Sequence, residues 1–521
     1  MTFPLLTILI LWQAAFQPGV RVDAARNAPG NHREITRLSS PAIPALVEAL
    51  AGEDAQTRDW ASTALGKIGK AAVPALLEAL KDGPARGPAA RALGEIGAPA
   101  TAATPALTEL LKSEDLALQR VAAEALGKIG PTAQAAVPAL LEILDSRHGA
   151  LRMEAARALG GIGGPAVPGL IKSLGRRGLS DLASETLVKI GPPAAPALLA
   201  ALKDPRPVIR TEACWALGRI YGANSLSAEA DEAVVSGLAN LLKDKDYLAR
   251  REAAEALARI GPDAGIAIPA LVQGLKDQNY IVQVAAVRAL GRVGPESTTA
   301  AAALVTTFQD ENFIAHAEAA RALGSIGYPA VPALAALLKD RALRSEAAQI
   351  LVQIGEASVP ALIDALKDTD PAVRNQSSEA LTKIGPDAVP ALLEALHAKD
   401  PDTRSQAAWA LGKITRDKKA QLVELQDIAA TLVRALKDVE ARVRANAAWS
   451  LGEICMVALT DLKLLDMVAE ALTESLADKA AEVRKEVVRA LRKAKPWRPG
   501  LPEGSVNSAI SSMRSSLSIS P

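Results

Sequence analysis

One pattern of apolar and polar positions returns along most of the chain. Each copy runs from a Pro through an Ala/Leu stretch, a turn such as Lys-Asp, an Arg, an Ala pair and Leu-Gly to a final Ile-Gly. In the first copy Ala61, Leu65 and Ile68 recur at helical spacing, and Gly69 follows where such a helix would end. Because Pro loses no hydrogen bond in the first turn of a helix, the Ala/Leu stretch predicts a first helix and the Ile-Gly segment a second. The Ile-Gly signature or a clear variant is found at Ile68, Ile96, Ile129, Ile162, Ile190, Ile220, Ile260, Val293, Ile326, Ile354, Ile384, Ile414 and Ile454, with a degenerate copy near Ala494.

These copies predict one stacked array of helix pairs rather than several globular domains. About fourteen copies fill residues 41–495 of the 521, which leaves roughly 32 residues for each, the length of two short helices and their turns. A single pair cannot bury its apolar face, so the pairs must stack on one another. We expect an all-α, right-handed α-solenoid of about fourteen helix pairs. At the turns, Asp204, Asp277 and Asp340 are expected to cap the second helix that follows.

The repeated residues resemble HEAT repeats, and in particular the HEAT-like repeats of the phycobilin (PBS) lyases. Units of that kind share the Pro–Ala–Leu first helix and the Arg–Ala–Ala–Leu–Gly–Ile–Gly second helix seen here, and the resemblance covers residues 41–495. It implies an armadillo-like helical array whose second helices line the concave side, and in which Arg–Asp pairs bridge adjacent repeats. Because this group includes enzymes as well as scaffolds, the chemistry-bearing residues must decide between them.

Arginine recurs seven residues before the signature Leu, which we interpret as a structural ladder that sets the stacking register. An Asp often lies four or six residues upstream, as Asp54 does before Arg58 and Asp246 before Arg250. A partly buried Arg can bind such a carboxylate through two parallel hydrogen bonds. The ladder consists of Arg58, Arg86, Arg152, Arg210, Arg250, Arg344, Arg374, Arg404, Arg444 and Arg484. Gln119 and Gln283 take the place of this Arg in two copies.

Copy lengths indicate an internal duplication. The spacings between successive signatures run 33, 33, 28 and 30 residues after Ile96 and again after Ile260. Gln119 and Gln283 fall in corresponding copies of the two blocks. We therefore hypothesise that a block of several pairs was duplicated with an offset of 164 residues.

The amino-acid composition argues against several classes of function. The chain is 49% hydrophobic but only 3% aromatic, so Ala and Leu must provide most of the core. With 59 Lys and Arg against 58 Asp and Glu, it has no net field to attract nucleic acid. None of the four His residues precedes a Glu, which excludes the His-Glu metal motif of the di-iron hydroxylases of this fold. Cys214 and Cys455 are expected to be inert core thiols, and we expect no catalytic residue, metal or cofactor.

The two ends of the chain differ from the repeats. Residues 4–16 form an apolar run that suits a secretory signal and is too short to span a bilayer, although no Lys or Arg precedes it. We expect a signal peptide at 1–24, a linker at 25–40 and a disordered Pro/Ser-rich tail at 496–521. The protein would then be exported to the periplasm or the extracellular space. If residues 1–24 instead form an apolar helix that covers the end of the array, the protein is cytoplasmic.

The expected exposed stripe of the second helices, on the concave side, carries charge and three tryptophans. Glu is frequent two residues after the ladder Arg, and Lys or Arg nine residues after it, which predicts an acidic ridge beside a basic one. Such a face is either neutralised by its own charges or a groove for a peptide or protein. Trp215, Trp409 and Trp449 lie five residues after their ladder Arg. Each ring either binds a partner or packs beneath a long connection of its own, and those connections span 221–233, 415–427 and 455–466.

Together these patterns predict a non-catalytic scaffold that binds a protein partner through the concave face of the array. The alternative is a subunit associated with an enzyme, like the phycobilin lyases. No partner, and no oligomeric state, can be named from the residues, and neither nucleic acid nor a membrane span is expected.

Overall fold

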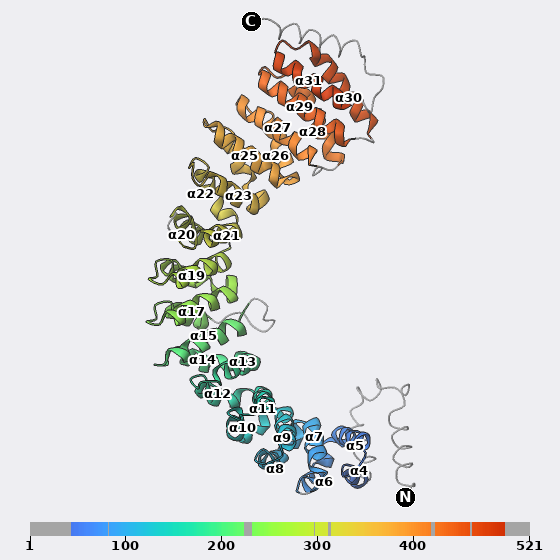
Figure 1. The fold of residues 1–521 in the computed structure, drawn as a ribbon, viewed down its shortest axis with the longest axis vertical. Coiled ribbons are helices and arrows are strands. Elements are labelled where there is room, and N and C mark those ends of the chain that lie inside the picture. Colours follow the sequence, from blue (N-terminus) through green and yellow to red (C-terminus); the bar gives the residue numbers. More distant parts are fainter. Residues whose placement is uncertain are drawn as a thin grey trace. The chain divides into compact units, whose positions relative to one another are not determined.

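A computed structural model describes most of the chain and divides it into two compact units. The described residues are 43–81, 83–222, 232–295, 297–310, 314–417, 422–458 and 461–494. Unit 1 comprises Met1–Ala267 and unit 2 comprises Ile268–Pro521. No strand occurs among the described residues, and a first and a second helix alternate along each unit (Figure 1). The predicted all-α solenoid of helix pairs is therefore confirmed, while its number of pairs stays a prediction.

Unit 1 begins at α4 and ends after α17. Its first helices are α4 (Ile43–Ala49), α6 (Val73–Ala79), α8 (Thr104–Leu110), α10 (Val137–Leu144), α12 (Val167–Ser173), α14 (Ala195–Ala201) and α16 (Glu232–Leu241). Its second helices are α5 (Ala55–Ile68), α7 (Arg86–Ile96), α9 (Leu116–Ile129), α11 (Gly149–Ile162), α13 (Ser180–Ile190), α15 (Pro207–Ile220) and α17 (Tyr247–Ile260). Short 3₁₀ turns follow most second helices, namely η2 (Gly69–Ala72), η3 (Ala98–Ala103), η4 (Gly130–Ala136), η5 (Gly164–Ala166), η6 (Pro192–Ala194) and η7 (Gly261–Ala267).

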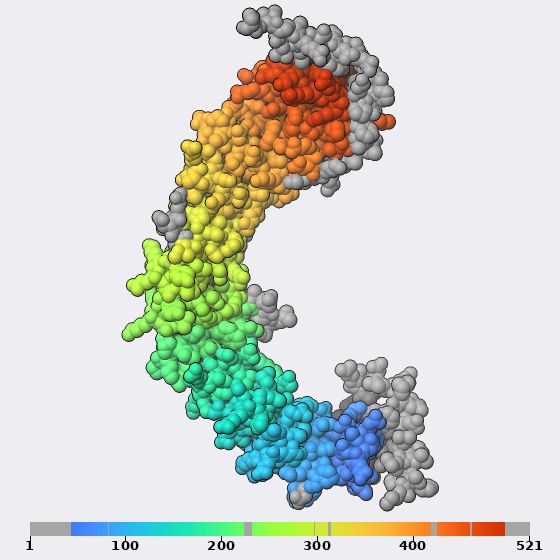
Figure 2. Space-filling view, in the orientation of Figure 1, coloured from blue at the N-terminus to red at the C-terminus, as the bar shows by residue number. Residues whose placement is uncertain are grey.

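Unit 2 continues the same alternation with longer helices toward its end. Its first helices are α18 (Ile268–Gly274), α20 (Thr298–Gln309), α22 (Val331–Leu337), α24 (Val359–Ala365), α26 (Val389–Ala395), α28 (Leu422–Ala435) and α30 (Leu462–Glu474). Its second helices are α19 (Tyr280–Val293), α21 (His316–Ile326), α23 (Arg344–Ile354), α25 (Pro371–Ile384), α27 (Pro401–Arg416), α29 (Ala441–Val457) and α31 (Ala481–Ala494). The 3₁₀ turns are η8 (Tyr328–Ala330), η9 (Gly355–Ser358), η10 (Pro386–Ala388) and η11 (Ser475–Ala477). Within the unit the surface colours follow the chain order, because each pair packs on its neighbours (Figure 2).

The helix ends follow the predicted signals. α6 begins at Val73, one residue before Pro74, so the missing N–H of Pro74 falls in the first turn. α5 ends at Ile68, and the next residue, Gly69, caps it: its N–H donates to the Leu65 carbonyl, and its backbone has φ 77° and ψ −144°. Residues with a side chain rarely adopt that conformation, which explains why glycine follows the signature Ile.

Small residues bring neighbouring second helices close together. Ala122, Ala123 and Leu126 of α9 are fully buried. A side chain built on Gly127 would place its Cβ atom 2.7 Å from the Ala158 Cα atom of α11, closer than such atoms approach in proteins. Larger aromatic side chains would not fit between helices at this distance, which accounts for the aromatic-poor composition.

The expectation that Asp204, Asp277 and Asp340 cap the second helix was wrong. Each carboxylate instead accepts the N–H of the residue two positions on, as Asp204 does from Arg206 at 2.9 Å, and closes a turn before the helix begins. Where a side chain caps the helix, the cap lies closer to it, as Asp246 does before α17. The connection from the first to the second helix therefore uses two polar positions rather than one.

The helix bounds support the hypothesis of a duplicated block. Six helices of unit 1 match six helices of unit 2 residue for residue at an offset of 164, namely α8, α9, α12, α13, α14 and α15 with α18, α19, α22, α23, α24 and α25. Only the pair α10 and α11 differs in length from its counterpart, α20 and α21.

Several predictions from the chain ends fall where the structure gives no description. The expected signal peptide at 1–24, the linker at 25–40 and the tail at 496–521 lie outside the described residues. In the part of the chain that is described, no helix is both long enough and apolar enough to cross a membrane.

Candidate functional site

The ladder arginines join one repeat to the next, and Arg404 shows how. Its Nη1 atom donates to the carbonyl oxygens of Ala398 and Lys399, both at 2.9 Å, at the end of the preceding turn. Its Nε and Nη2 atoms donate to the two carboxylate oxygens of Asp438, at 2.7 and 2.9 Å, in the turn before α29. The Arg404 and Asp438 side chains are only 11% and 12% exposed, so the pair is well shielded from water.

The bridge repeats so that each aspartate joins two arginines. The carbonyl oxygen of Asp438 accepts a hydrogen bond from Arg444 at 2.8 Å, while its carboxylate binds Arg404 and also accepts the Glu440 N–H. Arg444 in turn binds both carboxylate oxygens of Asp478, at 2.7 and 3.0 Å. The result is a continuous polar chain from α27 to α31.

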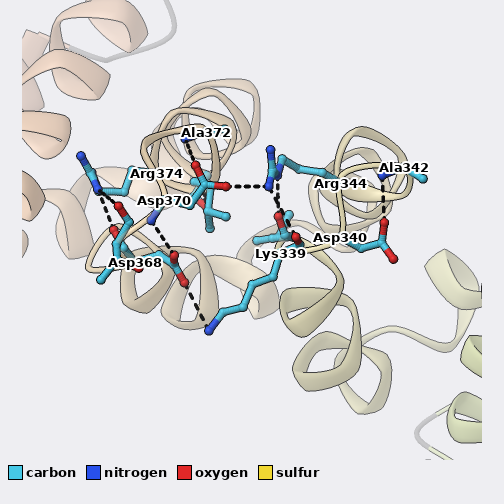
Figure 3. A network of polar contacts seen from close by, with 12 residues as sticks. Lys339, Asp340, Ala342, Arg344, Asp368, Asp370, Ala372 and Arg374 are labelled. Carbon is cyan, nitrogen blue, oxygen red and sulfur yellow. Dashed lines mark hydrogen bonds and ion pairs between the residues drawn. The ribbon is translucent and has the colours of Figure 1, made fainter.

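A variant of the bridge links α23 to α25 (Figure 3). Arg344 donates from Nε to the Leu338 carbonyl at 2.6 Å and from Nη2 to the Asp370 carboxylate at 2.8 Å. Arg374 donates to the Asp368 carbonyl at 2.7 Å, and Lys339 pairs with the Asp368 carboxylate at 3.3 Å. Here the bridging aspartate, Asp370, is also the cap of α25.

The other ladder residues fall into three groups. Arg210 binds Asp244 of the next repeat at 2.6 Å. Arg58, Arg250 and Arg484 donate to carbonyl oxygens five and six residues before them. Arg86 and Arg152 each bury an Nε atom that has no hydrogen-bond partner among the described residues, and Arg152 reaches the Gly178 carbonyl of the next repeat at 2.6 Å. The geometry suits a structural ladder, and its role in setting the register stays a prediction.

The two glutamines keep only half of this arrangement. Gln119 and Gln283 each donate from Nε2 to the carbonyl six residues before, at 2.6 and 2.7 Å. A neutral amide thus replaces the intra-repeat bond of Arg but brings no positive charge to a neighbouring carboxylate.

Acidic and basic side chains on the second helices pair with one another, although the acidic partner in these pairs lies five residues after the ladder position rather than two. Lys128 Nζ lies 2.7 Å from Glu124 of its own helix and 2.7 Å from Glu95 of α7. The hydrogen bond from Lys128 lowers the pKa of Glu124. Arg259 binds Glu255 in the same way at 3.3 Å. Pairing therefore runs within helices and also between neighbouring ones.

The expectation that the Glu residues two places after the ladder position are exposed was wrong in part. Glu154 and Glu252 are 8% and 4% exposed, because this position faces the adjacent second helix. Glu252 accepts from Arg259 at 2.7 Å, which compensates its burial. Burial raises the pKa of Glu212, which occupies the same position in α15.

Trp409 of α27 and Trp449 of α29 form a stacked pair. Their ring centroids are 6.5 Å apart with an angle of 18° between the ring planes, and both side chains are half-buried. The Trp449 ring rests on Gly412, where an added Cβ atom would lie 2.7 Å from the ring atom Cζ3. Lys413 Nζ lies 5.2 Å from the centroid of Trp409.

Trp215 of α15 lies in unit 1, is also half-buried, and has its own cation. The guanidinium carbon of Arg219 is 5.0 Å from the centroid of its ring. None of the three rings is fully buried. Whether the long connections cover them stays a prediction, because residues 223–231, 418–421 and 459–460 lie outside the described residues.

The cations over the rings, Lys413 and Arg219, belong to the predicted basic ridge, nine residues after Arg404 and Arg210. Their position over the rings was not predicted. Each follows its Trp by four residues, which places it on the same helix face, and that spacing is the signal that could have shown the contact.

Both cysteines are buried in the core. Burial raises the pKa of Cys214 well above its ordinary value and that of Cys455 to about 12, so neither thiol ionises near neutral pH. The described residues contain no group of three His, Cys, Asp or Glu that could hold a metal ion.

Comparisons with solved structures find helical arrays at low identity. The chain is similar to importin beta, with 14% identity over 94% of this chain and 78% of that one and a TM-score of 0.38. It is similar to Kap121p, with 16% identity over 98% and 66% of the two chains and a TM-score of 0.41, and to yeast importin-beta (Kap95p), with 13% identity over 95% and 77% and a TM-score of 0.36. At these scores the likeness says nothing of function. No curated protein sequence matches the chain.

Family models match the repeats directly. The model of PBS lyase HEAT-like repeats matches 57–82 and 249–277, as the resemblance predicted, and a further HEAT-like repeat model matches 165–220. The model of HEAT repeats matches six overlapping segments, 82–160, 104–185, 268–351, 331–412, 359–426 and 389–492. Because these segments cover more than half of the chain, the protein belongs to the family of HEAT-repeat proteins.

Proposed function

We propose that the protein is a non-catalytic scaffold and that it holds a protein partner on the second-helix face of α27 and α29. The stacked and half-buried pair of Trp409 and Trp449 is the observation that carries this proposal. Large aromatic side chains supply much of the energy of protein–protein contacts, and their cost in lost side-chain freedom is small. Helix pairs that stack in chain order supply a firm support for such a face.

The proposed role of Trp409 and Trp449 is tested by capturing a partner from the native source of the protein. Wild-type protein is expected to retain a partner that the double variant Trp409→Ala, Trp449→Ala loses, while thermal unfolding of the two stays within a few degrees. Tyr328→Ala serves as the matched control, because Tyr328 is an aromatic residue of the same unit that is 67% exposed away from the pair. Equal capture by the double variant would overturn the proposal.

The alternative role, that of an enzyme-associated subunit like the phycobilin lyases, has less support. The residues that match the repeat models are those that pack the helices, and they specify stacking rather than a reaction.

Export remains part of the proposal on the basis of residues 1–24 alone. A mature protein recovered from cells is then expected to begin at Ala25. An intact Met1 on protein from the cytoplasm would contradict it.

A further inference from the structure

Two second helices, α9 and α17, follow one charge rule at two positions. In both, Glu stands five residues after the ladder position and neutralises the cation four residues further on. Lys128 binds Glu124 at 2.7 Å in α9, and Arg259 binds Glu255 at 3.3 Å in α17. The positive charge on these helices is therefore already satisfied by the protein itself.

Tryptophan breaks this rule in α27 and α15. In α27, Trp409 takes the place of the Glu, and the Lys413 ammonium group lies over its ring, 5.2 Å from the centroid. In α15, Trp215 and Arg219 repeat the arrangement at 5.0 Å. Among the described residues, no carboxylate pairs with Lys413 or Arg219. An aromatic surface and an uncompensated positive charge thus occur together twice.

Beside the pair in unit 2, two described positions that often carry Glu in other copies carry amides instead. Gln406 and Asn446 stand two residues after their ladder Arg, where Glu is frequent in other copies. Gln406 donates to Asn375 at 2.9 Å, and Asn446 donates to the Ser405 carbonyl at 2.9 Å, so both amides are held in place. The nearby Glu453 is buried and bound by Lys493 of α31 at 2.7 Å. Lys413 is thus the cation that lies over the Trp409 ring, and no carboxylate of the described residues pairs with it.

The rings themselves form a fixed platform. Trp449 is seated on Gly412 of the neighbouring helix and stacks on Trp409, so the two helices hold both rings in one orientation. A platform that is ordered before binding loses little entropy when a partner arrives. Its flat apolar surface suits an aromatic or aliphatic side chain.

We propose that this site, formed by Trp409, Lys413 and Trp449, takes an acidic segment of the protein partner. An Asp or Glu carboxylate of the segment pairs with Lys413, and an adjacent aromatic or aliphatic side chain lies on the rings. The inference rests on the proposed function and adds the chemistry of the partner to it. Charge complementarity is the argument for this occupant, since a basic segment would meet Lys413 with like charge.

The test measures binding of short fluorescent peptides to the full chain by anisotropy at low salt. Three peptides of equal length alternate Phe with Glu, with Gln or with Lys. The Glu peptide is expected to bind most tightly, and Lys413→Glu is expected to weaken it by about tenfold or more and to reverse the preference toward the Lys peptide. The matched control is Lys128→Glu, which changes the same position of a repeat without Trp and should leave binding unchanged.

The outcomes separate this inference from the proposed function. If the double Trp variant loses the native partner but Lys413→Glu retains it and the peptides show no preference for Glu, the scaffold stands and the acidic segment is refuted. If the Lys peptide binds wild-type protein as tightly as the Glu peptide, the charge argument is refuted. If the double Trp variant keeps both the partner and the Glu peptide, both proposals fail.

Discussion

The repeats from α23 to α31 and those from α9 to α13 stack by different means. In the first region each ladder arginine from Arg344 to Arg444 binds a carboxylate of the next repeat. In the second region the ladder position is held by Gln119, Arg152 and Ser180, the last of which stands seven residues before Leu187, and none of them binds a described carboxylate. Gln119 and Ser180 donate only to carbonyl oxygens six residues before them.

The difference shows that one repeat fold can be held with or without ionic bridges. Both regions bury the same Ala and Leu positions, so apolar burial suffices to form the array. The bridges add directionality, because a bidentate Arg–carboxylate pair accepts one geometry. They occur in the region that carries the stacked tryptophans.

The largest expected effect comes from breaking a bridge. Arg404→Ala leaves the Asp438 carboxylate shielded and without its partner, and we expect a loss of about 3 kcal/mol from the stability of the surrounding repeats. Gln119→Ala removes one neutral hydrogen bond and should cost about 1 kcal/mol. Urea unfolding and hydrogen exchange of α27–α31 and α9–α13 measure the two losses. Equal losses would show that the bridges contribute nothing beyond the bond to the carbonyl.

Lowering the pH provides a second way to distinguish the stability of the two regions. Burial alone would raise the pKa of Asp438, but hydrogen bonds from Arg404 and the Glu440 N–H outweigh it, so the pKa lies below its usual value. The hydrogen bond from Arg444 lowers the pKa of Asp478. Because the folded pKa values are depressed, the stabilisation is complete above the unfolded value of about 3.9 and disappears as the pH falls through the folded values.

We therefore expect that exchange protection in α27–α31 falls more steeply below pH 4 than in α9–α13. Arg404→Gln should flatten that difference, since it removes the cation that lowers the pKa of Asp438. Parallel loss of protection in both regions of the wild-type protein would contradict the prediction.

We expect the smallest effect when an ionic bridge is introduced between α9 and α11 of unit 1. Ser146 Oγ accepts the His148 N–H at 3.2 Å, just as the Asp438 carboxylate accepts the Glu440 N–H at 2.9 Å. The double variant Gln119→Arg, Ser146→Asp should therefore recreate the pair and gain about 1 kcal/mol or less. A double-mutant cycle isolates the gain, and a coupling energy of zero would mean that these repeats stand in a different register.

Local features were predictable because they depend on neighbours in sequence. The helix pairs, the prolines in the first turn and Gly69 and its counterparts at the helix ends all follow from spacing and from backbone chemistry. The arginine positions were also visible, since their period is that of the repeat.

Features that join two repeats were not predictable in the same way. The signature spacing varies from 28 to 40 residues, so the carboxylate that meets Arg404 depends on how the repeats stack rather than on a fixed offset. The stacking of Trp409 on Trp449 needs the close approach of α27 and α29 at Gly412, and the burial of Glu252 depends on the adjacent helix. The prediction for Asp204 was wrong for a local reason, because an aspartate two residues before the N-cap position can close its own turn instead of capping the helix.

The matching of helix bounds at an offset of 164 residues has a consequence for how such a chain evolves. Both ends of the matched block fall between helix pairs, and the pair that follows each copy is bound in a similar way, by Arg210 to Asp244 and by Arg374 to Asp402. Under the hypothesis of duplication, recombination that copies whole pairs joins the end of each copy to the next pair through a similar Arg–Asp contact. The array would then lengthen in whole pairs, and the two copies would differ in single positions of one helix face, such as Trp215 of α15 and Glu379 of α25.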